Sequence, residues 1–344
     1  MRALVKTAPG VGNVAVTDVP DPAPGRGEVV VKVVCTTVCG TDVLVHDDKY
    51  VGKRPLPFPF VLGHEAAGEV AAVGPGVTGF RPGDRVGMES IIGCGQCHHC
   101  ARGEYNLCPR WHHIGLTMDG SFAEYIKVPA SLLIPLPEGV SFESASMLEP
   151  LSLAVHSLNS LQARPAQPTA IVGPGPIGLL HLLVAKAWGV GPILVLGRPG
   201  DEERLRISEE LGADRVLSAA SGEEALEAAR EMTDGVGMEL VIEATGAPDG
   251  VRTALELVAG NGKLVTTGLA RETEVDVLQI IRKNMVWMGR VASVRRHFLE
   301  ALRLIATGRV DPSRLITHRM PLEQGTEIFP LMKKRESLKI AFVS

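Results

Sequence analysis

The first 150 residues carry short apolar runs that Gly and Pro interrupt repeatedly. The segment 28–34 reads EVVVKVV, a β-branched run typical of a strand. Residues 63–77, GHEAAGEVAAVGPGV, combine small residues with strand and turn signals, and the segments 18–28 and 54–60 are rich in Pro or Gly. This pattern predicts a β-rich unit of short strands and loops.

After about residue 150, runs with strand and helix patterns alternate. TAIVG at 169–173 predicts a buried strand, IGLLHLLVAKAWG at 177–189 a helix, and PILVLG at 192–197 a second strand. The segment 201–212 has acids in its first turn and Gly212 at its end, which are helix start and stop signals. Such alternation predicts an α/β fold with a parallel, doubly wound sheet. The remaining predicted strands are 215–217, 239–246, 262–268 and 285–291, and the remaining predicted helices are 221–232, helices between 246 and 262, and 294–308. The segments 315–320 and 338–343 follow the last helix.

The composition is that of a globular protein without extreme charge. Of 344 residues, 45% are apolar and 22% charged, and this length favours about two domains. The formal net charge of −4 provides no basic field for nucleic acid, so we expect no such partner. The most apolar stretch, 171–196, is broken by Gly, Pro, His and Lys and predicts no membrane span. The N-terminus lacks a signal-peptide pattern, so we expect a cytoplasmic protein.

The segment GPGPIG at 173–178 fits the dinucleotide-binding pattern G-x-G-x-x-G. The pattern alone is weak evidence for dinucleotide binding. Here, however, it follows a predicted strand, opens a predicted helix, and is followed by a second strand about twenty residues later. Gly173 would make the tight turn, Gly175 would admit a pyrophosphate, and Gly178 would let the helix approach the strand. The free N–H groups at the helix start would bind phosphate. The predicted cofactor residues here are Gly173, Gly175, Pro176, Ile177 and Gly178.

The end of the second strand bears on the choice between NAD and NADP. An acid at this position usually binds the adenosine ribose of NAD, but this chain has Gly197 followed by Arg198. Glycine and arginine accommodate a 2′-phosphate that an acid would repel, which favours NADP. Asp201 and Glu202 follow closely and leave NAD open. The cofactor site is also predicted to include Arg204 and Leu269.

Four of the six cysteines lie close together, with the spacing C-x2-C-x2-C-x7-C. Four thiolates can surround one tetrahedral Zn²⁺ and leave no position open for chemistry. The loop around them has little apolar content, so metal ligation would supply free energy of folding that burial cannot. In a reducing compartment, clustered cysteines favour a metal site over disulfides. We therefore predict a structural zinc, with an iron–sulfur cluster as the alternative, at Cys94, Cys97, Cys100 and Cys108.

A second set of possible ligands is dispersed along the first 150 residues. Cys39 lies in VCGTD, His64 and Glu65 in GHEAAGEVAAVG, and Glu149 in MLEPLSLAVHS. A lone cysteine or histidine is more often a core residue than a ligand. Taken together, however, they offer the sulfur, nitrogen and oxygen donors of a catalytic zinc with an open position.

These motifs carry a resemblance to a known family. The chain resembles the zinc-dependent medium-chain alcohol dehydrogenases over nearly its whole length, and within them the polyol (sorbitol/iditol) and L-threonine dehydrogenase branch. GHEAAGEVAAVG is similar to the zinc signature of the family, and Glu149 is typical of this branch. Further similar segments are YNLCP at 105–109, DGSFAEY at 119–125, LEPLSLAVHS at 148–157, and the stretch from 289 to 322.

The resemblance implies two domains and an assembly. Residues 1–151 and 293–344 would form a GroES-like catalytic domain, and residues 152–292 a Rossmann dinucleotide-binding domain. The cleft between them would hold the catalytic zinc and the nicotinamide of NAD or NADP. The family implies two zinc ions per chain and a homo-oligomer, with a tetramer favoured and a dimer possible.

The resemblance also implies roles for single residues. Cys39, His64 and either Glu65 or Glu149 would hold the catalytic zinc, and Asp42 would orient His64. Thr41 would take the proton of the alcohol. Relatives commonly continue the proton relay with a histidine where this chain has Leu44, so His46 is the candidate replacement. Arg290 matches an arginine that lies near the substrate in polyol dehydrogenases.

The expected reaction is hydride transfer between a secondary alcohol and a nicotinamide cofactor, which yields a ketone. The substrate would be a polyol, a vicinal diol or L-threonine, and a sugar oxidised at C1 remains an alternative on the same metal core. Relatives that lack zinc act as quinone or enoyl reductases or as lens structural proteins. The full set of ligands in this chain argues against that reading.

Overall fold

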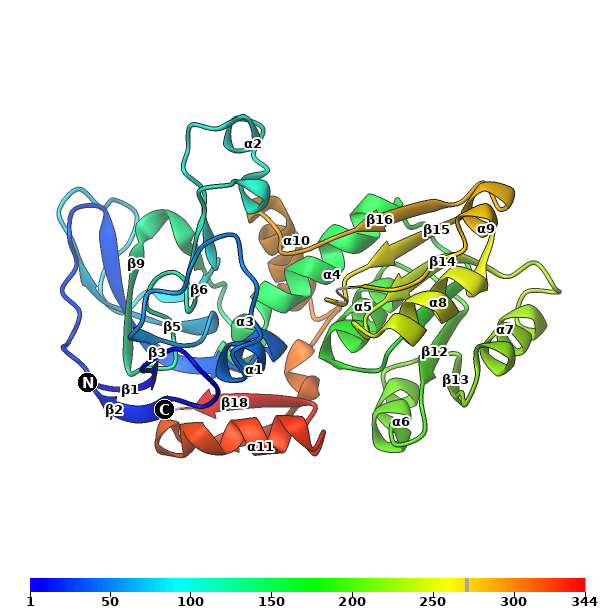
Figure 1. The fold of residues 1–344 in the computed structure, drawn as a ribbon. Helices are drawn as coiled ribbons and strands as arrows, with labels where there is room; N and C mark the ends of the chain where they lie inside the picture. Colours follow the sequence, from blue (N-terminus) through cyan, green and yellow to red (C-terminus); the bar gives the residue numbers. More distant parts are fainter. Residues whose placement is uncertain (270–271, 344) are drawn as a thin grey trace. The chain divides into compact units, whose positions relative to one another are not determined.

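The computed structural model describes residues 1–269 and 272–343, and contacts divide them into two compact units. Unit 1 comprises Met1–Ser152 and Ala292–Ser344, and unit 2 comprises Leu153–Val291. Figure 1 colours the chain from blue to red, so the return of the C-terminal segment to the N-terminal unit can be followed there. No described helix is long and apolar enough to cross a membrane.

Unit 1 is built on short strands. Its largest sheet has seven strands in the order β10-β6-β5-β3-β18-β17, with β9 paired to β3. The β-branched run at 28–34 lies in the long central strand of this sheet, with valines buried on it. The strands are β3 (Glu28–Thr37), β5 (Glu65–Val73), β6 (Arg85–Met88), β9 (Tyr125–Pro129), β10 (Leu133–Pro135), β17 (Ile316–Met320) and β18 (Lys339–Val343).

Smaller sheets and short helices complete unit 1. A three-stranded sheet contains β1 (Arg2–Lys6), β2 (Val14–Asp18) and β4 (Phe60–Val61), and a two-stranded sheet contains β7 (Ile91–Ile92) and β8 (His112–His113). The helices are α1 (Gly40–His46), α2 (His98–Ala101), α3 (Phe142–Ser146), α10 (Arg295–Ala306) and α11 (Ile328–Lys333). Four 3-10 helices lie at Tyr105–Leu107, Ala130–Leu132, Pro312–Leu315 and Leu322–Glu327.

The C-terminal strand belongs to the central sheet of unit 1. β18 pairs antiparallel with β3, so that Ala341 lies opposite Thr37. Thr37 in turn lies opposite Glu65 on β5. Segments that are about 300 residues apart in sequence therefore meet beside the residues predicted to bind metal.

Unit 2 is a six-stranded parallel sheet in the order β13-β12-β11-β14-β15-β16. This is the doubly wound order in which the direction of winding reverses between the first and fourth strands, here β11 and β14. The strands are β11 (Thr169–Val172), β12 (Ile193–Gly197), β13 (Arg215–Ser218), β14 (Met238–Glu243), β15 (Val258–Thr266) and β16 (Val286–Gly289).

The helices of unit 2 follow the strands as the alternating pattern predicts. In α5, the residues from Gly178 to Ala185 are all buried, because this helix packs deep in the unit. Ser221 begins α7 with its hydroxyl accepting the N–H of Glu224. The helix α4 was not predicted, and its first residues belong to unit 1. The helices are α4 (Leu148–Leu161), α5 (Pro176–Ala187), α6 (Glu202–Glu210), α7 (Gly222–Glu231), α8 (Pro248–Leu257) and α9 (Val277–Arg282).

Candidate metal centres and candidate dinucleotide site

Three of the predicted catalytic ligands lie together in unit 1. One potential ligand atom from each of Cys39, His64 and Glu65 lies within 4.8 Å of the other two. Cys39 precedes the first turn of α1, and Glu65 is the first residue of β5. His64 and Glu65 are buried, whereas Cys39 is partly exposed.

The backbone around these ligands is held in place by two local features. Gly63 has a φ of +91°, and a side chain there would collide with the ring of Phe122, so the turn into His64 needs glycine. At the other ligand, the N–H of Cys39 donates to Oδ2 of Asp42 at 2.9 Å. Asp42 thereby satisfies a free N–H group at the start of α1.

The two carboxylate oxygens of Glu65 differ in their polar contacts. Its Oε2 lies 2.5 Å from Nζ of Lys339 and also accepts the hydroxyl of Thr37. Its Oε1 is buried and has no hydrogen-bond partner among the described residues. A buried polar atom without a partner is costly, so an unpaired oxygen beside a thiol and an imidazole fits a metal ligand.

Anionic groups surround His64 and favour the protonated form of its imidazole. Burial disfavours the charged imidazole, but Cys39, Asp42 and Glu149 together raise the pKa of His64 to about 10. Its Nδ1 lies 3.8 Å from Oδ1 of the fully buried Asp42. Burial raises the pKa of Asp42, while the nearby His64 opposes that shift. A carboxylate behind a ligating histidine is the usual support of a zinc site.

The three ligand atoms are of the kinds that zinc binds. One sulfur, one imidazole nitrogen and one carboxylate oxygen are ligands that Zn²⁺ accepts, and three protein ligands are the number that catalytic zinc sites use. The buried and unpaired Oε1 of Glu65 gives an independent reason to expect a cation there.

Glu149 lies near this group but outside its tight set. The atoms that lie within 4.8 Å of one another include a carboxylate oxygen of Glu65 and none of Glu149. Glu149 is in the first turn of α4, where its Oε1 accepts the hydroxyl of Ser90 at 3.3 Å. Burial and the neighbouring Glu65 raise its pKa. Glu149 therefore interacts electrostatically with His64 and Glu65.

The two predicted proton-transfer residues have different surroundings. Oγ1 of Thr41 lies 3.6 Å from Sγ of Cys39. His46 is the last residue of α1, about 10 Å along the helix from Cys39 at 1.5 Å per residue. Its Nδ1 lies 2.7 Å from Oδ1 of Asp47, and its ring stacks on Phe329 at 4.1 Å between centroids. The relay function of His46 stays a prediction.

Several residues of this neighbourhood were not predicted. Lys339 is buried although it is a lysine, and it interrupts the apolar run LKIAFV, which was the available signal. Thr37 and Ser90 gave no signal, because serine and threonine are common everywhere. His113 lies edge-on to His64 at 5.1 Å, and burial, followed by repulsion from His64, lowers its pKa to about 3. A neutral histidine beside the group is consistent with a nearby cation.

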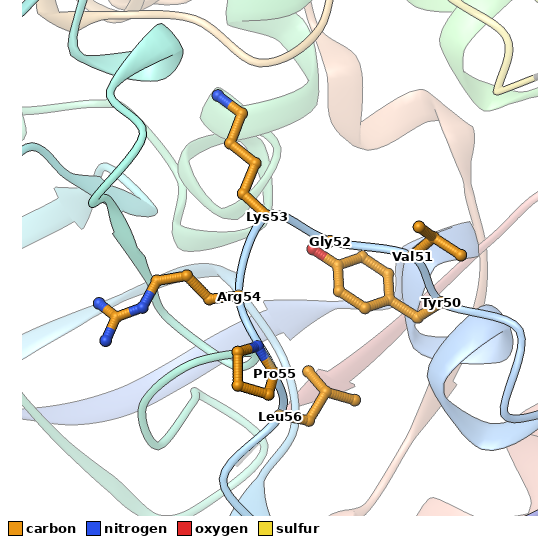
Figure 2. A pocket seen from close by; sticks show the side chains of 7 residues that line it. All are labelled: Tyr50, Val51, Gly52, Lys53, Arg54, Pro55 and Leu56. Atoms are coloured by element: carbon orange, nitrogen blue, oxygen red, sulfur yellow. The ribbon is translucent and has the colours of Figure 1, made fainter.

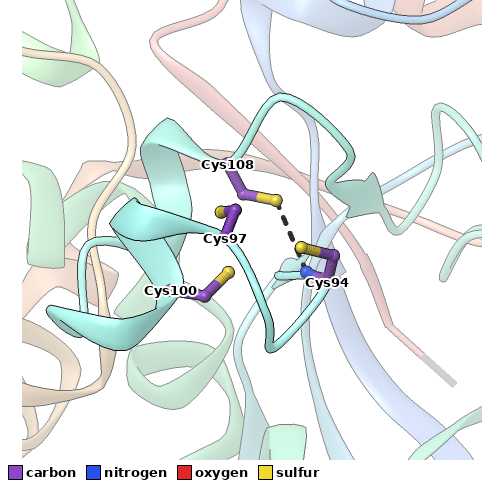
Figure 3. A group of neighbouring side chains, drawn as sticks. All are labelled: Cys94, Cys97, Cys100 and Cys108. Carbon is purple, nitrogen blue, oxygen red and sulfur yellow. Dashed lines mark hydrogen bonds between the residues drawn. The ribbon is translucent and has the colours of Figure 1, made fainter.

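The four clustered cysteines come together as predicted from their spacing. One sulfur from each lies within 4.8 Å of the others, and Figure 3 shows the four side chains gathered in one group. The Gln96 N–H and the guanidinium of Arg110 help to lower the pKa of Cys94 to about 6, which favours the thiolate. A Cβ at Gly93 would lie 2.7 Å from Sγ of Cys100, so the loop needs glycine for this close approach. Four sulfurs fit one tetrahedral zinc.

The glycine-rich turn of unit 2 connects β11 to α5. Gly173 has a φ of +106°, and a Cβ there would lie 2.8 Å from Cγ2 of Thr245. A Cβ at Gly178 would collide with the carbonyl oxygen of Gly173, whereas one at Gly175 would meet open space. Gly175 therefore leaves room for a ligand in front of the helix, which begins at Pro176 and Ile177. This turn can accommodate a pyrophosphate.

At the end of β12, the acidic residues are engaged by the local backbone. Oδ2 of Asp201 accepts the N–H of Arg198 at 3.2 Å, and Asp201 is buried. Oε1 of Glu202 accepts the N–H of Gly200 at 2.9 Å. Gly197 ends the strand, and the side chain of Arg198 is exposed directly after it. Arg204 lies in α6, partly exposed, and Leu269 is exposed beyond β15.

The guanidinium of Arg290 is bound within unit 2. Its Nε donates to Oγ of Ser160 at 2.7 Å, and its Nη1 donates to the carbonyl of Gly289 at 2.7 Å. Its backbone N–H extends the sheet by donating to Thr266. A substrate contact by Arg290 stays a prediction.

A pocket in unit 1 is lined by the segment from Tyr50 to Leu56. Figure 2 shows the ring of Tyr50 lying against Gly52, with Lys53 and Arg54 extending from the same loop. Nζ of Lys53 donates to the carbonyl of Asn106 at 3.2 Å, and Nη1 of Arg54 lies 2.8 Å from Nε2 of His112. Among the described residues, neither cation has a carboxylate partner. The loop is thus attached to the segment that leads to His113.

Comparison with known families covers both units. Residues 25–138 match the family model "Alcohol dehydrogenase GroES-like domain", and residues 176–307 match "Zinc-binding dehydrogenase". A sorbitol dehydrogenase of Halalkalibacterium halodurans is 35% identical over 343 residues, which are 99% of this chain and 98% of the relative. The chain belongs to the zinc-type medium-chain alcohol dehydrogenases. The predicted family, fold class and enzyme class are thereby confirmed.

Other relatives place this alcohol dehydrogenase in the polyol and threonine branch. An L-threonine 3-dehydrogenase of Pyrococcus horikoshii is 34% identical and covers 100% of this chain and 98% of its own. A D-arabitol-phosphate dehydrogenase of Enterococcus avium is 32% identical, with 100% and 97% covered. The branch that the motifs predicted is confirmed, and the substrates in the names of its members differ.

Solved structures of relatives contain both forms of the cofactor. An alcohol dehydrogenase from Escherichia coli CFT073 in complex with NADH has a TM-score of 0.90 at 28% identity, covering 100% of this chain and 99% of that chain. A putative zinc-binding dehydrogenase from Sinorhizobium meliloti 1021 bound to NADP has a TM-score of 0.89 at 28% identity, with the same coverage. Both folds extend over the whole of this dehydrogenase.

Proposed function

We propose that this dehydrogenase interconverts a secondary alcohol of the polyol, diol or threonine type and the corresponding ketone. The catalytic domain would comprise residues 1–151 and 293–344, and the cofactor domain residues 152–292. The observation that carries the proposal is the group of Cys39, His64 and Glu65, whose three different ligand atoms lie within 4.8 Å of one another. The relatives act, by their names, on polyols and on L-threonine.

The metal set determines the proposed chemistry. Zinc held by this set would polarise the hydroxyl of the substrate as a Lewis acid, and the nicotinamide would accept the hydride. Oγ1 of Thr41, which lies 3.6 Å from Sγ of Cys39, would receive the hydroxyl proton of the substrate. From Thr41 the proton would pass to solvent or to His46. Asp42 would hold the imidazole of His64 in its ligating orientation.

We propose Glu65 as the third ligand at rest. Lys339 and Thr37 bind its Oε2 and so orient the carboxylate, while the buried Oε1 is left for the metal. Glu149 would replace Glu65 or water during turnover. Its position next to Ser90 and its electrostatic contact with His64 support that second role.

We propose NADP as the preferred cofactor. Gly197 stands where an acid would bind the adenosine ribose of NAD, and the exposed Arg198 follows it. Asp201 and Glu202, the acids that could serve NAD instead, accept backbone N–H groups of their own loop. Arg204 and Leu269 would complete the site.

Arg198→Ala tests this preference. Losing charge-assisted hydrogen bonds to the 2′-phosphate is expected to lower kcat/KM for NADP by about 10- to 100-fold and to leave NAD unchanged. Steady-state kinetics with both cofactors measures the ratio. The matched control is Arg206→Ala, an exposed arginine on α6 that pairs with Glu203 and Glu210. A wild-type enzyme that prefers NAD would overturn the proposal.

A phosphorylated polyol is the second candidate substrate. Lys53 and Arg54 line one pocket with Tyr50 and have no carboxylate partner among the described residues, so the pocket lacks a counter-charge. Arg54 also donates to the carbonyl of Trp111, and the ring of Trp111 lies 5.3 Å from that of His113, which neighbours His64. The pocket and the metal group are thus linked by direct contacts. A relative named D-arabitol-phosphate dehydrogenase supports this candidate.

A substrate panel separates the candidates. We expect zinc-loaded protein to reduce the cofactor with one member of a panel that contains sorbitol, xylitol, L-threonine, 2,3-butanediol, glucose and a pentitol phosphate. Reduced nicotinamide is followed by its absorbance. If the phosphate is the substrate, Lys53→Ala with Arg54→Ala should raise its KM by about tenfold and leave unphosphorylated polyols unaffected. Silence across the panel from protein with a full metal content would contradict both candidates.

We further propose a cytoplasmic homo-oligomer, with a tetramer favoured over a dimer. The last strand of the parallel sheet, β16, has an open edge, and exposed apolar side chains lie on and near it, among them Val286, Trp287 and Val291. An apolar sheet edge of this kind favours association. None of the six cysteines forms a disulfide, which supports a reducing compartment.

A further inference from the structure

Glu243 is a buried carboxylate that the proposed chemistry leaves unused. It is the last residue of β14 and has no exposed surface. Its Oε1 accepts three donors, which are the N–H of Thr245 at 2.7 Å, the hydroxyl of Thr245 at 2.5 Å and the N–H of Gly246 at 3.0 Å. Its Oε2 is buried and has no hydrogen-bond partner among the described residues. Keeping such a group buried needs a compensating benefit.

The turn that Glu243 holds forms one wall of the glycine-rich turn. In the sheet register, Glu243 lies beside Val172, which immediately precedes Gly173. A Cβ at Gly173 would lie 2.8 Å from Cγ2 and 3.1 Å from the backbone nitrogen of Thr245. The backbone of the turn is therefore in contact with that of the pyrophosphate-binding loop, so the turn lies at the predicted dinucleotide site.

Glu243 also supports the loop on its other side. Its carbonyl oxygen accepts the N–H of Thr267 at 2.9 Å and the hydroxyl of Thr267 at 3.0 Å. A Cβ at Gly268 would lie 2.8 Å from Oε2 of Glu243 and would collide with the N–H of Gly246. One residue thus joins the loops that leave the carboxyl ends of β14 and β15.

Sheet topology indicates which half of the dinucleotide these loops face. In the doubly wound order, each set of three strands binds one nucleotide at its carboxyl ends. The end of β12, in the β13-β12-β11 half, is where the adenosine ribose is recognised. The β14-β15-β16 half is left for the nicotinamide nucleoside, and Glu243 lies at the first strand of that half.

We propose that Glu243 is a positioning residue for the nicotinamide half of the cofactor. It holds the turn at 244–246 and the loop at 267–268 in one arrangement, and through them the nicotinamide nucleoside. The inference rests on the proposed function only in requiring a nicotinamide dinucleotide at unit 2. It is independent of the metal ligands and of the alcohol.

Selective loss of dinucleotide affinity tests this role. Glu243→Gln keeps the acceptor Oε1 and the volume but places an N–H₂ group against Gly268. We expect the Kd of NADPH, or of NADH if the enzyme prefers NAD, to rise about tenfold in a fluorescence titration. The Kd of the matching adenosine diphosphate, with or without a 2′-phosphate, should stay within twofold because this probe lacks the nicotinamide nucleoside. The deuterium isotope effect on kcat should increase, because misplacement slows the hydride step.

The control and a second variant keep the test decisive. Glu239→Gln makes the same change on the same strand, at an exposed acid that accepts a hydrogen bond from Gln167, and should alter neither Kd. If Glu243→Gln does not fold, Thr245→Val removes one donor to Oε1 and should show the same selectivity with about a threefold change. Equal losses for both probes, or no loss for either, would overturn the positioning role. Wild-type protein that binds neither dinucleotide would instead contradict the proposed function.

Discussion

Cys39→Ala is expected to lower kcat/KM by about a thousandfold or more. The substitution removes one of three ligand atoms, and the remaining pair is too few to hold zinc, because catalytic zinc sites use three protein ligands. A Lewis-acid metal contributes several kcal/mol to stabilising the transition state, and about 4 kcal/mol corresponds to three factors of ten. The variant should contain about one zinc per chain, and the wild type about two.

Two measurements make this prediction specific. Elemental analysis reports the zinc content, and steady-state kinetics reports the activity, on the same dialysed sample. The control is Cys35→Ala, which removes a buried thiol of β3. This thiol lies 3.4 Å from Oγ of Ser146 and belongs to neither of the two candidate metal groups. It should keep two zinc ions and an activity within about twofold. A fully metallated and active Cys39→Ala enzyme would show that the metal group lies elsewhere.

Removing a sulfur from the second group is expected to unfold a loop rather than to stop the chemistry directly. Cys100→Ser takes away one of four thiolates in a loop that has few apolar residues, so the remaining three should lose their metal. Structural zinc supplies folding free energy outright, but most of the loss here should appear as local opening. Cys108 is the buried member of the four, and the other three cysteines are only partly buried against the core. We expect the free energy of unfolding of the whole chain to fall by about 3 kcal/mol, which for 344 residues is a Tm decrease of about 4 °C.

Limited proteolysis separates local opening from general damage. Cleavage between residues 93 and 110 should accelerate by about a hundredfold, because proteolysis follows the population of the open form. His98→Ala is the matched control, since this exposed histidine lies on α2 within the same loop and is not among the four ligands. Elemental analysis of the wild type also distinguishes zinc from iron. A Cys100→Ser protein with unchanged metal content and protease resistance would contradict a structural metal.

The elements of the fold were predictable where their signals are local. The strand TAIVG, the glycine-rich turn and the following helix appear at their predicted positions, because backbone access and burial require those residue types there. The spacing of the four clustered cysteines also predicted that their sulfurs meet, since short loops restrict where each sulfur can lie. The helix α4 was not predicted, because Pro150 interrupts the helical pattern of its sequence, although proline is tolerated in the first turn of a helix.

The sequence by itself determined the family, the α/β fold class, the glycine-rich cofactor turn and the identities of the possible metal ligands. Only the tertiary structure decided which of them meet. It placed Glu65, and not Glu149, within 4.8 Å of Cys39 and His64, and it brought Lys339 from the C-terminal strand onto Glu65. It also showed that one carboxylate oxygen of Glu243 accepts hydrogen bonds and that the other has no partner among the residues described. The reason is physical: the pairing of β18 with β3 and the register of parallel strands depend on contacts between distant segments, and local sequence carries no record of such contacts.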